Sequence, residues 1–121
     1  MKNLNKMNGR VAEQIAVQYL QQDGYLILDT NWQCKIGEID IIALKGDYLV
    51  IVEVRSRKND LFGSGLESIN LTKQKKIAKT SVEYIKSKDF FDKNVRFDCI
   101  QIDGSTDILH IVDAFDTHIR I

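Results

Sequence analysis

Residues 37–55, with the sequence GEIDIIALKGDYLVIVEVR, decide the fold. Two apolar runs, Glu38 to Leu44 and Tyr48 to Arg55, flank the dipeptide Gly46-Asp47. Such a dipeptide suits a two-residue primed β-turn, and runs rich in Ile, Leu and Val favour strands. Because both faces of each run are apolar, we expect the two strands in the middle of a sheet that is covered on both sides. The segment therefore predicts a central β-hairpin.

Two carboxylates interrupt the apolar pattern of this hairpin. Counting back from the Gly46-Asp47 turn places Asp40 directly opposite Glu53. Cross-strand partners have Cβ atoms about 4.5 to 5.5 Å apart, and like charges at that distance repel. A divalent cation between the two carboxylates would resolve the conflict, and Mg²⁺ or Mn²⁺ suits such a site, because either ion completes its coordination with water and substrate phosphate. The alternative is that both residues lie near frayed strand ends and are solvated or paired with Arg55 or Arg57.

The rest of the chain alternates helices and strands around the hairpin. Apolar residues at three-to-four spacing predict one helix over Asn8–Asp23, capped by Gly24, and a second from an Asn70 cap to about Lys88. Three further apolar runs predict strands over Tyr25–Trp32, Val95–Ile102 and Ile108–Phe115. This order predicts an α/β protein with a mixed central β-sheet of about five strands flanked by helices. With no proline, linker or repeat in the sequence, we expect a single domain over residues 1–121.

Composition narrows the class of protein. The chain is 44% hydrophobic and 28% charged, which is typical of globular proteins and argues against disorder. No apolar run approaches the roughly 18 residues of a transmembrane helix, and residues 1–10 lack a signal-peptide core, so we expect a cytoplasmic protein with no membrane partner. The formal net charge is zero, so binding to nucleic acid would have to come from local clusters of basic residues. Cys34 and Cys99 have neither zinc-site nor disulfide spacing and are expected to be free thiols.

Short motifs in this order resemble a known family. Asp40 followed by Glu53-Val54-Arg55 resembles the D-x(n)-(D/E)-x-K signature of restriction-endonuclease-like nucleases. A wider set of motifs resembles the YraN-like family of small bacterial proteins over about Asn8 to Phe115, namely Gly37-Glu38-Ile39-Asp40, Val52-Glu53-Val54-Arg55-Ser56-Arg57, Phe62-Gly63, Lys73-Gln74 and Arg96-Phe97-Asp98. The resemblance implies a restriction-endonuclease-like fold, a cytoplasmic setting and a nuclease role.

The resemblance also implies roles for two helical residues. Glu13, in the first predicted helix, would correspond to the acidic residue that such nucleases often bring to the metal site. From the sequence alone an ordinary solvated glutamate is equally consistent, because Glu13 lies off the apolar stripe of the helix. Gln74 would correspond to a glutamine that lies near the active site in several related nucleases.

Arg55 stands where the nuclease signature has lysine. A lysine can lose its proton when its pKa is depressed, whereas arginine stays protonated in proteins. Arg55 therefore cannot act as the general base, and activation of water would fall to the metal. It can still bind a phosphate oxygen or stabilise the charge of the carboxylates.

Basic residues cluster near the predicted carboxylate pair. Arg57 and Lys58 follow Arg55 at the end of its strand. On the second predicted helix Lys73 and Lys76 share one face, as do Lys75 and Lys79. Beside a metal site these residues would form a surface that follows a phosphate backbone. A solvated lysine face is the alternative for each of the lysines. We interpret Asp98 as a structural, hydrogen-bonding acid rather than a metal ligand.

These observations lead to one main hypothesis and two alternatives. The main hypothesis is a Mg²⁺- or Mn²⁺-dependent endonuclease acting on DNA rather than RNA, with branched or repair and recombination intermediates as candidate substrates. Asp40 and Glu53 would bind the metal, Glu13 would complete or orient the site, and Arg55 would stabilise charge. The alternatives are a non-catalytic nucleic-acid-binding module that keeps the nuclease fold and a protein-interaction scaffold. The sequence leaves open whether a homodimer forms.

Overall fold

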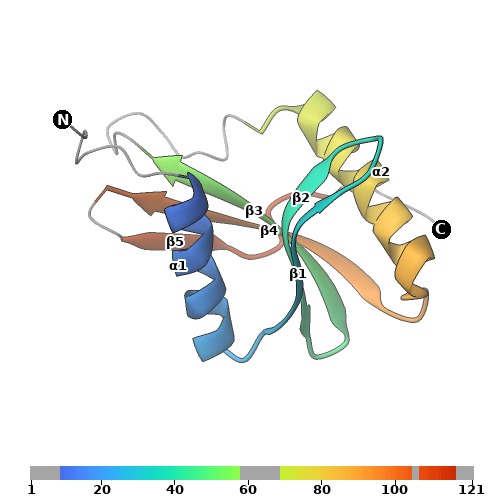
Figure 1. Cartoon of the computed structure of the whole chain (residues 1–121), viewed down its shortest axis with the longest axis horizontal. Coiled ribbons are helices and arrows are strands. Elements are labelled where there is room, and N and C mark those ends of the chain that lie inside the picture. Colours follow the sequence, from blue (N-terminus) through green and yellow to red (C-terminus); the bar gives the residue numbers. More distant parts are fainter. Residues whose placement is uncertain (1–8, 58–68, 105–106, 117–121) are drawn as a thin grey trace.

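The computed structural model describes residues 9–57, 69–104 and 107–116 (Figure 1). Two helices and five strands occupy these ranges: α1 (Gly9–Gln22), β1 (Leu26–Gln33), β2 (Glu38–Lys45), β3 (Tyr48–Arg57), α2 (Leu71–Lys88), β4 (Asn94–Asp103) and β5 (Ile108–Ile111). The order and type of the elements are those predicted. That residues 1–121 form one domain stays a prediction.

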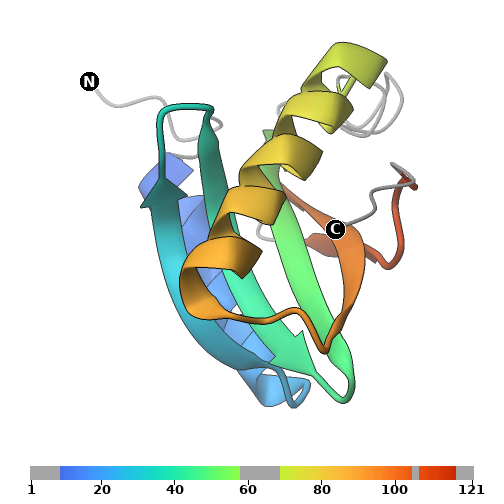
Figure 2. The same ribbon diagram turned by 90° about the vertical axis from the view of Figure 1, so that its right-hand side faces the viewer.

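The five strands form one mixed sheet in the order β1-β2-β3-β4-β5. Strands β1, β2 and β3 make an antiparallel meander, β4 runs parallel to β3, and β5 returns antiparallel to β4. Figure 2 shows α2 crossing in front of the strands while α1 lies behind them. The predicted α/β architecture, a mixed central sheet flanked by helices, is confirmed.

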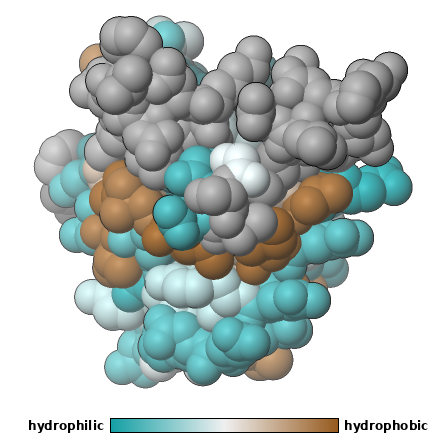
Figure 3. Space-filling model, turned by 90° about the vertical axis from the view of Figure 1, so that its left-hand side faces the viewer, coloured by the Kyte–Doolittle hydropathy of each residue, from teal (hydrophilic) through white to brown (hydrophobic). Residues whose placement is uncertain are grey.

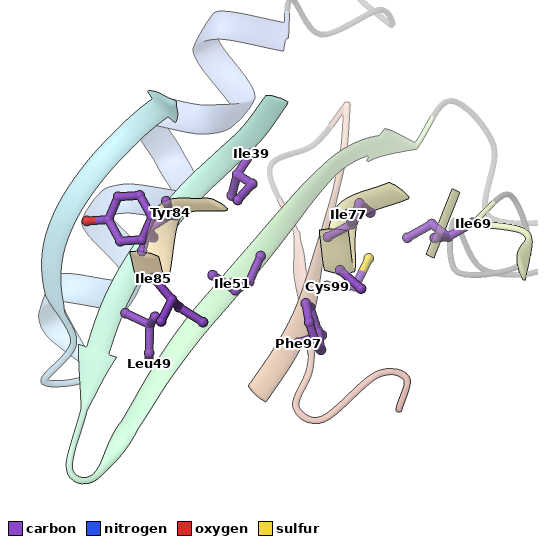
Figure 4. Close-up of a cluster of buried hydrophobic side chains, with 11 residues drawn as sticks. Ile39, Leu49, Ile51, Ile69, Ile77, Tyr84, Ile85, Phe97 and Cys99 are labelled. Carbon is purple, nitrogen blue, oxygen red and sulfur yellow. The ribbon is translucent and has the colours of Figure 1, made fainter. Parts of the chain in front are cut away.

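Each face of the sheet carries its own hydrophobic core. On one face Ala12, Ala16 and Leu20 of α1 pack against a set of buried strand residues: Ile41, Ala43, Val50, Val52, Ile100 and Ile102. On the other face Ile77, Tyr84 and Ile85 of α2 pack against a second set: Ile39, Ile42, Leu49, Ile51, Phe97 and Cys99 (Figure 4). Burial on both faces explains why β2 and β3 are apolar throughout.

The hairpin between β2 and β3 has the predicted register. Its pairs run from Lys45 opposite Tyr48 to Ile41 opposite Val52. Gly46 in the turn has φ of +58°, as the first central residue of a primed turn requires. The pairing ends at Ile41, so Asp40 is the first residue of β2 beyond the ladder.

Ile39 departs from the alternation that the sequence suggests. Simple alternation puts Ile39 on the same face as Ile41, but Ile39 packs in the core beneath α2 and Ile41 in the core beneath α1. The irregularity coincides with Asn31 of β1, which has φ of +52° and lies between the residues paired with Ile39 and Ile41. The strand pair is therefore distorted next to Asp40.

Strand β5 is shorter than predicted. The sequence suggested a strand over Ile108–Phe115, but β5 ends at Ile111 and Asp113 has φ of +57°. The turn brings the Asp113 backbone N–H to Asp98 Oδ1 at 3.0 Å. After β5 the backbone therefore hydrogen-bonds to the buried carboxylate of Asp98 instead of to β4.

Asp98, which is fully buried, is the centre of a hydrogen-bond network. Arg96 donates to its two oxygens through Nε at 2.9 Å and Nη2 at 3.0 Å, and His110 Nε2 lies 2.8 Å from Oδ2. Burial by itself would raise the pKa of Asp98, but the hydrogen bonds from His110 and Arg96 outweigh burial and hold the pKa below its usual value. The interpretation of Asp98 as a structural acid agrees with this geometry.

The network also includes Tyr19 of α1 and Tyr25, which lies just before β1. His110 Nδ1 lies 3.0 Å from the Tyr19 hydroxyl oxygen, so the imidazole ring connects Tyr19 to Asp98. Arg96 Nη2 also donates to the Tyr25 hydroxyl at 2.7 Å. These contacts tie α1 and the start of β1 to β4 and β5.

None of the helices in the described ranges combines the length and apolar character needed to cross a membrane. On the face shown in Figure 3, hydrophobic surface gathers in a band across the middle and hydrophilic surface covers the part below it. At the β5 edge of the sheet, Leu109 remains 42% exposed.

Asp98→Asn should lower the free energy of unfolding by about 3 to 5 kcal/mol, because it leaves the half-buried Arg96 without its charged partner. Asp92→Asn, at an exposed position, should change the same quantity by less than about 0.5 kcal/mol. Denaturant unfolding of both variants measures the difference. Equal, small effects would show that the network contributes little to stability.

Candidate active site

Strands β2 and β3 and helix α2 enclose a pocket of about 340 Å³. It lies where β2 ends its pairing with β3. The lining residues are Glu38, Asp40, Glu53, Val54, Arg55, Lys73, Lys76, Ile77 and Thr80. The pocket therefore joins both predicted carboxylates with three basic side chains that come from two different elements.

Asp40 is held in place by the backbone of β3. Its Oδ2 accepts a hydrogen bond from the Val54 N–H at 2.8 Å. In a regular ladder the Val54 N–H would bond a carbonyl of β2, so the carboxylate replaces a backbone acceptor at this position. The bond restricts the Asp40 side chain to an orientation in which it also lines the pocket.

Glu53 hydrogen-bonds directly with Asp40. Burial, this hydrogen bond and the negative charge of Asp40 raise the pKa of Glu53 to about 8, although Lys73 and Arg55 act in the opposite direction. The juxtaposition inferred from the hairpin register is therefore present. At neutral pH the metal-free carboxylate pair holds a proton.

The pair fits a small divalent cation with oxygen ligands. Mg²⁺ is commonly bound by one or two carboxylates and completes its octahedron with water and substrate phosphates. Among the described residues, no group of three or more His, Cys, Asp or Glu side chains is placed to hold a metal. A metal here would thus be held by Asp40 and Glu53 and would keep several positions for other ligands.

Glu13 does not line the pocket of Asp40 and Glu53. It lines a second pocket of about 760 Å³ between α1 and β1, where it hydrogen-bonds with Asn31. Burial raises the pKa of Glu13, the Asn31 hydrogen bond lowers it, and the charges of Asp40 and Glu38 raise it. Glu13 is therefore electrostatically connected with Asp40 but is placed in a different cavity.

Arg55 lines the pocket beside Glu53 and is half-buried. Its Nε and Nη2 atoms are buried and have no hydrogen-bond partner within the described part of the chain.

Cys99, the strand partner of Glu53, is a buried free thiol, and burial raises its pKa to about 11. Cys34 is also free, so the prediction for both cysteines is confirmed.

The predicted basic residues divide into two groups. Lys73 and Lys76 line the pocket, whereas Lys75 and Lys79 do not. The amide of Gln74 donates to the Ile69 carbonyl at 2.9 Å, next to the start of α2, and is absent from the pocket lining.

Some predicted site residues lie outside what the structure describes. Arg57 belongs to β3, but its side chain falls outside the described residues, as do Lys58 and the Phe62-Gly63 motif. Their places at the site stay predictions.

Three contributions to the pocket were not anticipated from the sequence. Glu38 and Thr80 line it, and Gly37 allows the β1–β2 turn to approach α2 closely. A Cβ atom at Gly37 would lie 2.9 Å from Thr80 Oγ1 and 3.2 Å from Lys76 Cε. The signal was present in the sequence GEID, where the glycine directly precedes the strand that carries Asp40.

The raised pKa of Glu53 predicts how stability depends on pH in chelator. Protonated Glu53 favours the folded state, so its contribution is complete below the ordinary pKa of 4.5 and is lost as the pH rises through about 8. The free energy of unfolding of the parent should therefore fall, relative to that of Glu53→Gln, between pH 4.5 and 8. Denaturant unfolding at several pH values measures this difference.

Asp40→Asn provides the matched control. It removes the neighbouring charge but leaves Glu53 buried, so the fall with pH should become smaller without disappearing. Parallel curves for the parent and Glu53→Gln would contradict a raised pKa.

The comparisons with known proteins all identify the same family. A profile described as "Uncharacterised protein family UPF0102" matches residues 12–102. The chain is 43% identical over 122 residues to a "UPF0102 protein" of Clostridium botulinum, covering 97% of this chain and 100% of that protein. It is 44% identical over 120 residues to a "UPF0102 protein" of Clostridium kluyveri, covering 95% and 98% of the two chains. It is also 44% identical over 115 residues to one of Legionella pneumophila, covering 93% and 98%. In agreement with the resemblance found in the motifs, the chain belongs to the UPF0102 family.

Proposed function

We propose that this protein is a metal-dependent endonuclease that hydrolyses phosphodiester bonds of nucleic acid, DNA rather than RNA. The observation that carries the proposal is the pairing of Asp40 with Glu53 in a pocket that also contains Lys73, Lys76 and Arg55. Two carboxylates forced together are unfavourable on their own. Beside basic side chains, they suit a cation that a phosphate also contacts.

The chain's own residues would position the reactants. Asp40, fixed by the Val54 N–H, and Glu53 would hold Mg²⁺ or Mn²⁺. When bound, such an ion supplies Lewis acidity and lowers the pKa of water. Lys73 and Lys76 would contact phosphate oxygens, and the permanent charge of Arg55 would stabilise negative charge that develops on the scissile phosphate.

The pocket supports recognition of the backbone of a nucleic acid. Its basic residues present charge that suits phosphates, and phosphate contacts position a protein without specifying sequence. This favours substrates distinguished by structure, such as branched or repair and recombination intermediates. A cytoplasmic location and pairing of two copies on one substrate stay predictions.

Arg55 favours a second candidate function. Because this position carries arginine where the nuclease signature has lysine, the protein could bind nucleic acid without cleaving it. The two candidates differ in turnover alone. Incubation with single-stranded, duplex and branched DNA and RNA, with Mn²⁺ or with chelator, separates them: the nuclease proposal requires metal-dependent products, and their absence on every substrate would favour the binding module.

Melting curves test the metal site independently of any substrate. In chelator above pH 8, where Glu53 is ionised, Asp40→Asn should melt at least as high as the parent, because it removes like-charge repulsion of about 1 kcal/mol while the amide oxygen can still accept from Val54. In millimolar Mn²⁺ the order should reverse, because the ion stabilises the folded parent by mass action and binds the variant poorly. Differential scanning fluorimetry with and without Mn²⁺ measures both.

Glu53→Gln should behave as Asp40→Asn does. Glu38→Gln, which changes an exposed carboxylate of the same pocket, should keep most of the response to Mn²⁺. If Mn²⁺ does not change the melting temperature of the parent protein, the proposed metal site is wrong.

The two groups of lysines should differ in their effect on binding to DNA. Lys73→Ala and Lys76→Ala should each reduce the slope of log K against log salt by about one unit, because each removes a phosphate contact. Lys75→Ala and Lys79→Ala, exposed on the same helix but outside the pocket, should leave the slope unchanged. Fluorescence anisotropy in chelator at several salt concentrations measures the slopes; equal slopes for all four variants would assign the lysines to a solvated face.

A further inference from the structure

Strands β3 and β4 place a second pair of polar side chains next to the carboxylates. Arg55 and Gln101 are Cα partners in the parallel register, two residues beyond the pair of Glu53 and Cys99. Cys99 belongs to the core beneath α2, and residues two apart in a strand point to the same face. Arg55 and Gln101 therefore lie side by side on the α2 face of the sheet.

Both side chains have hydrogen-bonding capacity that the described part of the chain does not satisfy. The Nε and Nη2 atoms of Arg55 are buried without a partner, and so are the Nε2 and Oε1 atoms of Gln101, whose exposure is 0%. A buried polar atom without a partner carries its full desolvation penalty, and native proteins contain few of them. Four such atoms on neighbouring residues indicate a ligand rather than a structural role.

Pairing between the two residues cannot satisfy them. Rotation of the amide would allow Gln101 Oε1 to accept from the guanidinium group, even from both of its unpaired nitrogens. The amide Nε2 would still have no acceptor. The pair has three donor nitrogens and one acceptor oxygen, so the missing partner is rich in acceptors.

The carboxylates of the pocket are already engaged. Asp40 accepts from the Val54 N–H, and Glu53 hydrogen-bonds with Asp40. Arg55 lines the pocket and Gln101 does not, so a ligand in the pocket would meet Arg55 first and the Gln101 amide beside it.

We propose that Arg55 and Gln101 together form an oxyanion receptor that takes a phosphate group. A guanidinium group binds two phosphate oxygens with parallel N–H donors, and the Gln101 amide adds a neutral donor beside it. The phosphate can belong to a nucleic acid or be free inorganic phosphate. In its first form the inference rests on the proposed function and adds Gln101 as a substrate-positioning residue next to the Asp40–Glu53 pair.

Calorimetric titration of inorganic phosphate into the full chain in chelator tests the receptor without a metal. Arg55→Met and Gln101→Met should each weaken phosphate binding by at least about tenfold, which corresponds to 1.4 kcal/mol. Lys86→Met removes a positive charge at the far end of α2 and should leave the affinity within about twofold of the parent. Unchanged phosphate affinity in Gln101→Met, or no phosphate binding by the parent, would overturn the proposal.

The Gln101 variants are expected to fold. Methionine has nearly the volume of glutamine and removes two unsatisfied polar atoms, so Gln101→Met should melt at or above the parent. Gln101→Glu offers a second route, because the new carboxylate would pair with Arg55 and occupy the receptor. It should weaken phosphate binding as much as Gln101→Met does, and retention of the parent affinity by both variants would refute the receptor.

A DNA oligonucleotide distinguishes the two sources of phosphate. If Gln101→Met weakens binding of the oligonucleotide and of inorganic phosphate, the receptor takes nucleic-acid phosphate; if only inorganic phosphate is affected, it takes free phosphate. Cleavage assays remain a separate measurement. Gln101-dependent phosphate binding without cleavage would refute the nuclease and keep the receptor, whereas cleavage with unchanged phosphate affinity in Gln101→Met would do the opposite.

Discussion

The hydrogen bond from the Val54 N–H to the carboxylate of Asp40 connects the fold to the site. Strand β2 stops pairing with β3 after Ile41, and the Asp40 side chain supplies the acceptor that a backbone carbonyl would otherwise provide. The same bond orients the carboxylate toward Glu53. If the Asp40 side chain turned away into solvent, the partly buried N–H of Val54 in a central strand would be left unpaired. The geometry of the pocket is thus fixed by the architecture of the sheet.

The folded protein holds Asp40 and Glu53 so close together that they repel each other when both are ionised. Two unit charges 4 Å apart interact by about 4 kcal/mol at an effective dielectric constant of 20, so a like-charged pair inside a pocket is a substantial burden. Lys73 and Arg55 act against it, yet the pKa of Glu53 still rises to about 8. The neighbouring cations therefore only partly compensate for burial and the charge of Asp40. A proton completes the compensation in the metal-free protein, and a divalent ion would have to displace that proton when it binds.

The sequence was sufficient to predict those features that depend on local pattern. The Gly46-Asp47 turn and the alternation of the flanking strands predicted which carboxylates face each other, and the spacing of α2 predicted that Lys73 and Lys76 share a face. The sequence did not predict contacts between distant segments. Tyr19 and His110 lie 91 residues apart, and no local pattern indicates their hydrogen bond. The place of Glu13 in a separate cavity follows from how α1 docks on the sheet, which spacing within the helix does not determine.

Arginine at position 55 has a consequence for the whole pocket that lysine would not have. At a half-buried site beside Glu53, desolvation would lower the pKa of a lysine and the carboxylate would raise it, so the charge of a lysine would depend on the balance of the two effects. The guanidinium group keeps its charge. The positive charge next to Glu53 is therefore constant while the carboxylate pair gains or loses its proton. Ionisation of Glu53 above pH 8 therefore changes the charge of the carboxylates while the charge of the guanidinium group stays the same, so a metal-binding site gains charge beside a fixed cation.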